Sequence, residues 1–261
     1  MSLQADTPFV LRSDAGGVTT LTLNRSERFN PLSEEMLAAL QTEFKAIATD
    51  ESVRVVVLAA AGKAFCAGHD LKQMQANSSE AYYKSLFQQC SKLMLAIQKL
   101  PQPVIARVHG LATAAGCQLV GMCDLAVASD NASFAVSGVN VGLFCSTPAV
   151  ALSRNVSRKQ AMEMLLTGDF IDAQTAMQRG LINRVTSPEQ LDACVAELAA
   201  SIVAKPALAI SMGKQLFYKQ LEMGVEAAYQ LAGQTMACNM LDASAQEGVQ
   251  AFLAKRRPDW S

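Results

Sequence analysis

The sequence predicts an α/β fold that is followed by a region made only of helices. Three segments, Val53–Ala59, Val104–Val108 and Leu125–Ser129, are short runs of mostly β-branched or small apolar residues. Such runs are typical of strands that are buried on both faces of a parallel sheet. Segments with helical spacing separate them, so strand, crossover helix and strand repeat along the chain. Beyond about residue 190 the apolar residues follow helical spacing alone.

The N-terminal part of the chain predicts a hairpin and then a helix. Phe9–Arg12 and Val18–Leu23 flank the turn Asp14-Ala15-Gly16-Gly17, and glycines of this kind favour a β-hairpin. Ser33 stands where a helix N-cap is expected, with acidic residues in the first turn after it. The apolar stripe of this helix consists of Met36, Leu37, Leu40, Phe44 and Ile47.

Further helices are expected between the strands and throughout the C-terminal part. One helical pattern covers about residues 79–99, another begins at about Thr113, and a short strand is predicted at Ser133–Val136. Apolar faces rich in alanine and methionine mark the C-terminal helices, which indicates a separate lobe or a contact between copies of the chain. These helices are expected at Leu191–Ala204, Ala207–Leu221, Val225–Met240 and Ala243–Lys255.

Length and composition limit the possible classes of protein. The 261 residues suffice for one large domain, or for one domain with an appendage, and 51% hydrophobic residues allow a sizeable core. The formal net charge of -1 gives no electrostatic reason to expect nucleic acid or an anionic membrane as partner. Neither nucleic acid nor a membrane is therefore expected as a partner.

The cysteines and the N-terminus bear on the compartment. Seven cysteines occur at scattered positions without a CxxC pair, which favours reduced cysteines used as small apolar residues over disulfides or a zinc site. The N-terminus lacks the basic segment and apolar run of a secretory signal. A cytoplasmic location is therefore predicted.

Two glycine-containing loops follow two of the predicted buried strands. The first is AGKAFCAGHDL, residues 61–71, and the second is GLATAAGCQL, residues 110–119. Small residues at the ends of parallel strands allow tight turns with exposed N–H groups, and the N–H groups at a helix start favour negative charge. The two loops together predict two backbone donors for one carbonyl oxygen, an oxyanion hole. Neither loop matches a phosphate loop, a GxGxxG fingerprint or a GxSxG elbow.

These loops belong to a set of five segments that resembles the crotonase family, the enoyl-CoA hydratase/isomerase superfamily. The segments occur in the family's order over nearly the whole chain. They are NRSERFNPLS (24–33), AFCAGHDL (64–71), PVIARVHGLATAAGCQL (103–119), MCDLAVA (122–128) and the ending with Glu247-Gly248, Ala251-Phe252-Leu253 and Lys255-Arg256.

The resemblance implies a fold, a ligand and an assembly. The implied fold is a crotonase-type β-β-α spiral core over residues 1–195, followed by a C-terminal α-helical trimerisation region over residues 196–261. The implied ligand is an acyl-CoA thioester of fatty acid metabolism, with coenzyme A as part of the substrate and with no separate cofactor and no metal. The implied assembly is a homotrimer or a hexamer.

The resemblance also assigns site residues, position by position. The thioester oxygen would accept hydrogen bonds from the N–H groups of His69 and Ala115. The family typically has glycine at the second position, but alanine retains the N–H. Phe252 and Lys255 would serve the ligand of a neighbouring subunit. The other substrate-binding positions are Arg28, Phe29, Ala67, Asp70, Leu71 and Lys72.

Both acids of the family's hydratases are missing. Adding water to an α,β-unsaturated thioester needs groups that activate water and exchange the α-proton, and two glutamates do this work in the hydratases. Their positions hold Gln118 and Gly138 here. Gln118 follows Ala115 by three residues, so we expect both on one helix face, directed at the ligand. Glutamine can orient a ligand but neither gives nor takes a proton near neutral pH, so little or no hydratase activity is predicted.

Two alternatives remain open at this stage. In the first, the chain is an active enzyme with other enolate chemistry, such as an isomerase or a decarboxylase, that uses Cys145, Ser146 or His69. In the second, it is a non-catalytic regulatory protein that binds a CoA thioester. Packing is the simpler interpretation of Cys145 and Ser146. By the same reasoning, we expect a structural hydrogen bond from His109 and a buried strand-capping carboxylate at Asp124.

Overall fold

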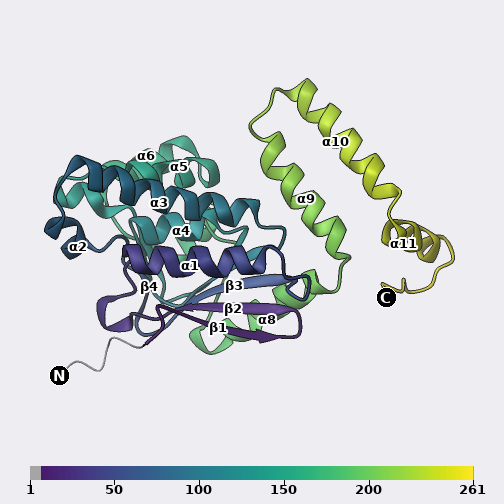
Figure 1. Ribbon diagram of the computed structural model, residues 1–261, viewed down its shortest axis with the longest axis horizontal. Coiled ribbons are helices and arrows are strands. Elements are labelled where there is room, and N and C mark those ends of the chain that lie inside the picture. Colours follow the sequence, from purple (N-terminus) through teal and green to yellow (C-terminus); the bar gives the residue numbers. More distant parts are fainter. Residues whose placement is uncertain (1–6, 261) are drawn as a thin grey trace.

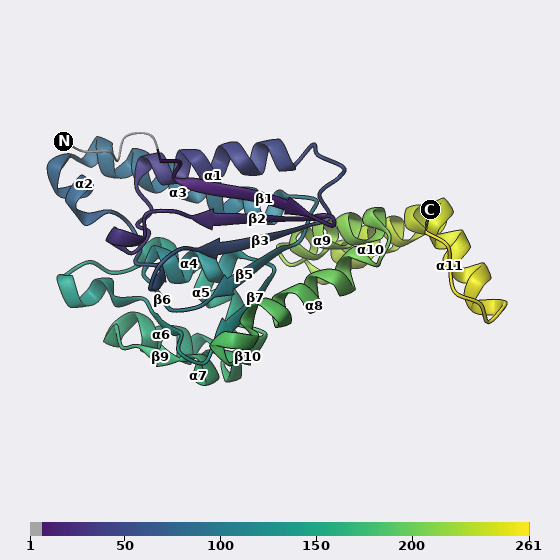
Figure 2. The ribbon, with the colours of Figure 1, turned by 90° about the horizontal axis from the view of Figure 1, so that it is seen from below.

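The computed structural model describes residues 7–260, and its core contains two β-sheets (Figures 1 and 2). In the larger sheet only the N-terminal hairpin is antiparallel, and the other neighbouring strands are parallel. The order of its strands is β1 (Val10–Ala15), β2 (Val18–Leu23), β3 (Val55–Ala60), β5 (Val104–Val108), β7 (Leu125–Ser129) and β10 (Arg184–Thr186).

The smaller sheet consists of very short strands, three of which directly follow strands of the larger sheet. Its order is β4 (Ala64–Cys66), β6 (Leu111–Thr113), β8 (Ser133–Ala135) and β9 (Ile171–Asp172). Strand β3 leads to β4, β5 to β6, and β7 to β8, and a helix comes after each pair. This repeated β-β-α unit is the core that the resemblance implies. The expectation of plain loops at residues 61–71 and 110–119 is wrong in one respect, because β4 and β6 lie inside them.

The described residues contain eleven α-helices. Ser33 caps the first of them as expected, because its hydroxyl accepts a hydrogen bond from the N–H of Met36 at 3.3 Å. The helix that the sequence predicts from Thr113 begins at Ala115. The helices are α1 (Glu34–Ile47), α2 (Leu71–Ala76), α3 (Glu80–Lys99), α4 (Ala115–Met122), α5 (Ser146–Asn155), α6 (Arg158–Thr167), α7 (Ala173–Gln178), α8 (Leu191–Val203), α9 (Ala207–Gln220), α10 (Val225–Met240) and α11 (Ala243–Leu253).

Alternate side chains of β3 divide the apolar residues into two clusters. Val56 and Leu58 join the larger cluster, which packs against α1, α3 and α4. Val55 and Val57 belong to the smaller cluster, to which α8 contributes Leu191, Val195 and Ala199. Side chains of a strand point alternately to its two faces, so the sheet is buried on both sides, as its continuous apolar runs predict.

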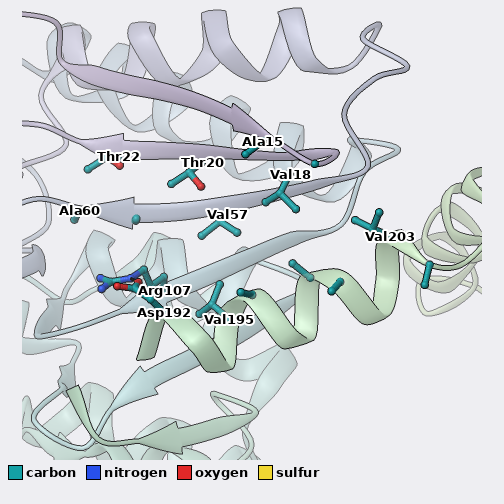
Figure 3. A pocket seen from close by; sticks show the side chains of 16 residues that line it. Ala15, Val18, Thr20, Thr22, Val57, Ala60, Arg107, Asp192, Val195 and Val203 are labelled. Carbon is teal, nitrogen blue, oxygen red and sulfur yellow. Dashed lines mark hydrogen bonds and ion pairs between the residues drawn. The ribbon is translucent and has the colours of Figure 1, made fainter. Parts of the chain in front are cut away.

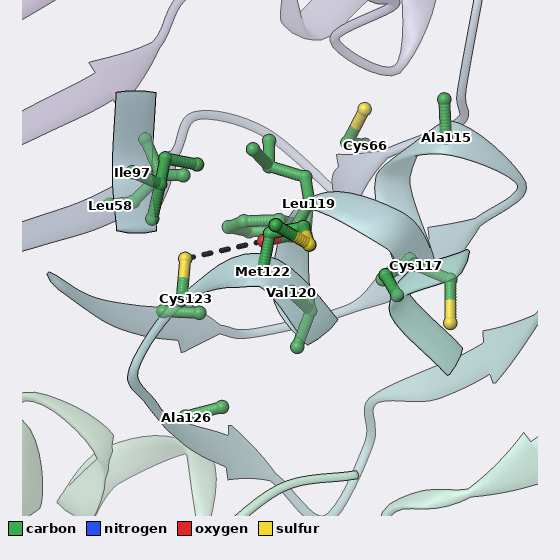
Figure 4. Packing of buried hydrophobic residues seen from close by; sticks show 14 of the residues in the cluster. Leu58, Cys66, Ile97, Ala115, Cys117, Leu119, Val120, Met122, Cys123 and Ala126 are labelled. Carbon is green, nitrogen blue, oxygen red and sulfur yellow. Dashed lines mark hydrogen bonds between the residues drawn. The ribbon is translucent and has the colours of Figure 1, made fainter. Parts of the chain in front are cut away.

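Helix α4 connects the larger core to the loops of the smaller sheet. In Figure 4 its side chains Leu119 and Met122 lie toward Leu58 and Ile97, whereas Cys66 lies beside the start of the helix. Every residue of α4 is buried. Packing on all sides therefore fixes the position of its first turn, which matters for the site described below.

The last three helices extend away from the sheets (Figures 1 and 2). Among the described residues, α10 has no buried side chain and α11 has only Ala251. Large apolar side chains are exposed along them, including Tyr229 (77%), Leu241 (78%) and Phe252 (82%). A predicted domain boundary between residues 195 and 196 falls within α8, which lies on the sheet.

A buried lysine joins α9 to the core. Lys214 Nζ donates hydrogen bonds to Asp124 Oδ2 at 2.7 Å and to the carbonyl oxygens of Ile97 and Gln102 at 2.8 and 2.9 Å. Asp124 also accepts hydrogen bonds from the N–H of Val104 and the hydroxyl of Tyr218. The expectation that Asp124 caps a strand is confirmed by its bond to the first residue of β5, but its side chain is only partly buried, at 13% exposure.

No single helix within residues 7–260 is both long enough and apolar enough to cross a bilayer; one pair, Pro188–Val203 with Ala207–Gln220, passes that test jointly but is bent by 102°.

Candidate functional site

The two predicted loops touch each other through their backbones. Strand β4 pairs in parallel with β6. Glycine is required where the backbones of the two loops come closest. A Cβ atom added to Gly68 would lie 3.2 Å from the nitrogen of Ala115, and one added to Gly116 would lie 2.1 Å from the carbonyl oxygen of Cys66. The loop that carries His69 and the first turn of α4 are therefore held side by side, as the sequence predicts for loops that end neighbouring parallel strands.

The two N–H groups singled out by the sequence are both available. Within residues 7–260, neither the N–H of His69 nor that of Ala115 donates a hydrogen bond to another residue. Ala115 is the first residue of α4, and N–H groups at a helix start carry partial positive charge. Two unpartnered amides beside each other can bind one carbonyl oxygen.

The turn before α4 is strained. Ala114 has φ 50° and ψ −120°, and it is one of four non-glycine residues with positive φ among those described. This conformation is one that glycine adopts readily and alanine does not. Strain of about 1–3 kcal/mol persists only where the surroundings enforce it. Here the backbone contact with Gly68 and the burial of α4 do so.

A cavity of about 230 Å³ lies next to these amides. Seven predicted site residues line it, and its other walls are mainly apolar. The seven are Ala67, His69, Leu71, Ala115, Gly138, Cys145 and Ser146. Side chains that the sequence analysis missed contribute to these walls: Met74, Phe87, Val141, Leu143, Phe144 and Pro148. Sequence spacing alone carries no signal for them, because α3 and the segment after β8 approach the loops only in the folded chain.

The imidazole of His69 has a defined tautomer. Its Nδ1 lies 3.1 Å from the carbonyl oxygen of Leu32, and because a carbonyl oxygen can only accept, Nδ1 carries the proton. Nε2 is buried and has no hydrogen-bond partner among the described residues. The ring lies 5.6 Å from that of Phe87, measured between centroids. Burial lowers the pKa of His69, although the contact with Leu32 opposes that shift, so the imidazole is neutral at pH 7.

The two positions that the resemblance assigns to the hydratase acids, Gln118 and Gly138, hold no proton-transfer group. Gln118 is buried at 5% exposure, its Oε1 has no partner among residues 7–260, and it is not one of the residues that line the cavity. Gln118 therefore does not line this cavity, and its orientation toward a bound ligand stays a prediction. Gly138 does line it, but an added Cβ would lie 2.4 Å from the carbonyl oxygen of Leu143 and 2.8 Å from Cys145 Sγ.

Cys145 and Ser146 show packing roles in this structure. Cys145 is buried, its Sγ accepts a hydrogen bond from the N–H of Gly138 at 3.3 Å, and burial raises the pKa of the thiol. A raised pKa disfavours the nucleophilic thiolate. Ser146 begins α5 and donates to the carbonyl oxygen of Phe144 at 3.3 Å. Ser137 lines the same cavity, and its hydroxyl lies 2.9 Å from that of Thr113.

The early segment 24–33 packs against the first loop. The carbonyl oxygen of Phe29 accepts from the N–H of Ala67 at 3.0 Å, and the N–H of Leu32 donates to Gly68 at 2.8 Å. Arg28 donates to Asp70 at 2.6 Å, and Asp70 also caps α2. Arg28, Asp70 and Lys72 line a surface hollow of about 670 Å³. The predicted substrate-binding residues of this segment therefore lie together, although Asp70 is occupied by partners in its own chain.

Two predicted binding residues are remote from this cavity. Phe252 and Lys255 lie in and just after α11, at the opposite end of the molecule from α2 in both ribbon views (Figures 1 and 2). They cannot contact a ligand in the cavity of their own chain. This arrangement leaves open the expected role at a neighbouring subunit.

A larger cavity, about 730 Å³, lies elsewhere, between α8 and the outer face of the larger sheet (Figure 3). Its walls are mostly alanine, valine and threonine, and its charged side chains, Arg107 and Asp192, are bonded to each other. It therefore offers no group for chemistry.

His109 donates a structural hydrogen bond from its Nε2 to the carbonyl oxygen of Gly62 at 2.9 Å, as expected. No group of three His, Cys, Asp or Glu side chains within residues 7–260 could hold a metal ion.

The β-β-α core and the paired loops are those of the crotonase class, and comparison with known proteins agrees. The Enoyl-CoA hydratase/isomerase family matches residues 13–261. The chain belongs to that family, and the predicted fold is confirmed. A crystal structure of an enoyl-CoA hydratase from Mycobacterium smegmatis is 64% identical, with a TM-score of 0.96 over 97% of this chain and 99% of that one.

A human relative extends the comparison. Enoyl-CoA hydratase domain-containing protein 3, mitochondrial, from Homo sapiens is 46% identical over 94% of this chain and 81% of its own length. Its crystal structure superposes with a TM-score of 0.94, at 44% identity, over 97% of this chain and 100% of that one. The 1,2-epoxyphenylacetyl-CoA isomerase of Escherichia coli is 32% identical over 97% of this chain and 98% of its own length.

The comparison contradicts the predicted cytoplasmic location. The human protein and its relatives from rat, mouse and zebrafish, which are 45–47% identical to this chain, are all named as mitochondrial proteins. The cysteine pattern that supported the prediction indicates a reducing environment but does not separate one reducing compartment from another.

Proposed function

We propose that this protein binds an acyl-CoA thioester and that the N–H groups of His69 and Ala115 form an oxyanion hole for its carbonyl oxygen. The observation that carries the proposal is the pair of unpartnered amides, held together by the contact of Gly68 with α4 beside an apolar cavity. Backbone donors that are fixed before the ligand arrives need no reorganisation when charge develops on the oxygen. An acyl chain fits the apolar walls of the cavity.

The coenzyme A part of the ligand would bind at the surface hollow beside Arg28 and Lys72. Both are cations, and their side chains suit phosphate groups. Phe29 is half exposed, so its ring is available to an apolar or aromatic part of the ligand. Coenzyme A enters as part of the substrate, and the proposal requires no further cofactor and no metal.

Little or no hydratase activity accompanies this binding. General acid–base catalysis contributes about 10²–10⁴-fold to rate, and Gln118 and Gly138 supply neither a base nor an acid. Turnover with crotonyl-CoA should therefore fall far below the enzyme median of about 10 s⁻¹. A rate near that median would contradict this part of the proposal.

A second candidate function is enolate chemistry of another kind, such as isomerisation or decarboxylation. It is favoured by the neutral imidazole of His69, a residue that lines the cavity and whose Nε2 carries no proton. Exchange of the α-proton of butyryl-CoA in deuterium oxide, followed by NMR, separates this function from simple binding. Exchange that is absent in a His69→Phe variant would support it, and no exchange in the unchanged protein would exclude it in favour of a binding or regulatory role.

We further propose that the assembly is a homotrimer or a hexamer, formed through the helices from residue 196 onward. Exposed apolar side chains along α10 and α11 support this, because helices that bury almost nothing in their own chain gain stability by packing against another. Phe252 and Lys255 would then approach the ligand of a neighbouring subunit. Light scattering of the unchanged protein and of a Tyr229→Glu, Leu241→Glu variant would test the assembly.

The binding proposal is tested with two ligands that differ only in the thioester carbonyl oxygen. Butyryl-CoA has the thioester carbonyl, whereas S-butyl-CoA has the same chain without that oxygen. Isothermal titration should show about tenfold tighter binding of butyryl-CoA, which corresponds to about 1.4 kcal/mol for two donated hydrogen bonds. Equal affinities would contradict the oxyanion hole.

A proline variant removes one donor. Proline is tolerated at the first position of a helix and has no N–H, so Ala115→Pro should reduce the preference for butyryl-CoA. Arg158→Pro, at the exposed first position of α6, is the matched control and should leave the preference unchanged. Circular dichroism of both variants verifies that they fold.

A further inference from the structure

The C-terminal tail folds back onto α11 and is held there by Glu247. Arg256 donates hydrogen bonds to both carboxylate oxygens of Glu247, at 2.5 and 2.8 Å, and the N–H of Asp259 donates a third at 2.8 Å. The ring of Trp260 lies against Gly248, since a Cβ added there would be 2.9 Å from that ring. Glu247, Gly248, Arg256 and Trp260 are called the tail clasp below.

The turn inside the clasp places a lysine where helices ordinarily have glycine. The N–H of Arg256 donates to the carbonyl oxygen of Ala251 at 3.0 Å, and the N–H of Lys255 donates to that of Phe252 at 3.1 Å. These two bonds form a Schellman motif, whose left-handed residue is usually glycine. Here that residue is Lys255, with φ 52°.

Stability within the chain does not account for this lysine. The left-handed conformation costs a residue with a side chain about 1–2 kcal/mol, whereas a cation at a helix C-terminus gains about 0.3–1 kcal/mol from the helix dipole. Glycine at this position would avoid the cost. Lys255 is exposed, and its ammonium belongs to none of the ion pairs among residues 7–260.

The other described residues that share this strain lie at the proposed site. Besides Lys255, the non-glycine residues with positive φ are Phe29 and Asn30, in the segment that lines the surface hollow, and Ala114, before the first turn of α4. Strained backbone of this kind clusters at functional sites. Lys255 follows α11, far from the cavity of its own chain (Figures 1 and 2). An anion that its ammonium serves therefore belongs to a second copy of the chain.

We propose that Glu247 and Arg256 are positioning residues, which hold Lys255 in its strained turn so that its ammonium contacts a phosphate group of the ligand bound to a second copy. This inference rests on the proposed function, from which it takes both the coenzyme A thioester and the assembly. Glu247 and Arg256 touch no ligand and act only through Lys255. Loss of the clasp should therefore weaken the hold on the nucleotide part of the ligand and leave the acyl part unaffected.

Butyryl-pantetheine, which lacks the nucleotide and all its phosphates, is the reference ligand for the test. Isothermal titration gives the affinity ratio of butyryl-CoA to butyryl-pantetheine, and this ratio should fall about tenfold in Lys255→Met because a charged hydrogen bond is lost. Lys255→Gly should lose as much, although glycine suits the turn. Arg257→Met, in the same tail, is the matched control and should leave the ratio unchanged.

The results that contradict a role for Lys255 are equally definite. A ratio that survives in Lys255→Met, or a ratio near one in the unchanged protein, would overturn the proposal. A weakened assembly with an unchanged ratio would assign Lys255 to an ion pair between copies and overturn it too. The comparison of butyryl-CoA with S-butyl-CoA shows separately whether the oxyanion hole exists.

The positioning role is tested at Glu247. Trp260 is the only tryptophan of the chain, so a shift of its fluorescence in Glu247→Gln reports that the clasp has loosened. The ratio should then fall about threefold, the usual cost of immobilising one long side chain, while the mass from light scattering stays the same. Glu226→Gln, exposed in the first turn of α10, is the control. An unchanged ratio in Glu247→Gln, or a lower ratio that comes only with dissociation of the assembly, would overturn the positioning role.

Discussion

The thiol of Cys145 occupies the space that a side chain at Gly138 would need. The N–H of Gly138 donates to Cys145 Sγ at 3.3 Å, and a Cβ added to Gly138 would lie 2.8 Å from that sulfur. The carbonyl oxygen of Leu143 lies closer still, at 2.4 Å. The position to which the resemblance assigns one of the hydratase glutamates is therefore closed by packing, and substituting glutamate there would not by itself open it.

A methyl group at this position should therefore destabilise the fold. Overpacking typically costs about 1–3 kcal/mol, so Gly138→Ala should lower the free energy of unfolding by about that amount in urea denaturation. Gly213→Ala serves as control, because an added Cβ there meets nothing within 4 Å and alanine favours a helix. A Gly138→Ala variant as stable as the unchanged protein would contradict the close packing around Gly138.

The strained turn before α4 leads to a prediction of the opposite sign. Ala114→Gly should raise the free energy of unfolding by about 1 kcal/mol, since relief of positive φ outweighs the added freedom of glycine in the unfolded chain. The same substitution at Ala38, an exposed position within α1, should lower it by about 1 kcal/mol. If both substitutions destabilise equally, the turn at Ala114 is not strained.

The buried lysine of α9 should be essential to stability. Lys214→Met removes the cation and leaves the carboxylate of Asp124 buried with only neutral donors. Breaking a buried pair in this way typically costs about 3–5 kcal/mol. Lys205→Met, at an exposed position before α9, provides the matched control and should change stability little. A loss below about 1 kcal/mol for Lys214→Met would show that this contact does not hold α9 to the core.

Acid should destabilise the protein before most carboxylates titrate. Burial is the main cause that lowers the pKa of both histidines, His69 and His109, below the ordinary value of about 6.5. The unfolded chain then binds more protons than the folded chain once the pH falls below about 6.5, so stability decreases as pH is lowered. Urea midpoints at pH 7.5 and 5.5 should differ, and a His69→Gln, His109→Gln variant should show a smaller difference. An unchanged pH dependence in that variant would contradict this assignment.

Local patterns in the sequence predicted most of the fold. Val104–Val108 and Leu125–Ser129 are strands with the predicted bounds, and Val225–Met240 is a helix as predicted. Strands β4 and β6 escaped detection because each has only three residues. Strands this short show no periodicity, and pairing between segments more than 40 residues apart leaves no local signal.

The candidate site was predictable only in part. The sequence could predict that His69 lies near Ala115, because each residue belongs to a loop that follows one of two neighbouring parallel strands. The contact of His69 with Leu32 joins residues 37 positions apart, and the closure of Gly138 by Cys145 depends on how the chain turns after β8. Such contacts are determined by tertiary packing, so neither spacing nor composition indicates them.

A crystal structure with bound butyryl-CoA would test the central claim most directly. We predict that the thioester oxygen lies about 2.7–3.1 Å from the backbone nitrogens of both His69 and Ala115. We also predict that no carboxylate lies within hydrogen-bond reach of the α or β carbon. A thioester oxygen bound elsewhere, or a carboxylate that reaches those carbons from another loop or subunit, would contradict the account.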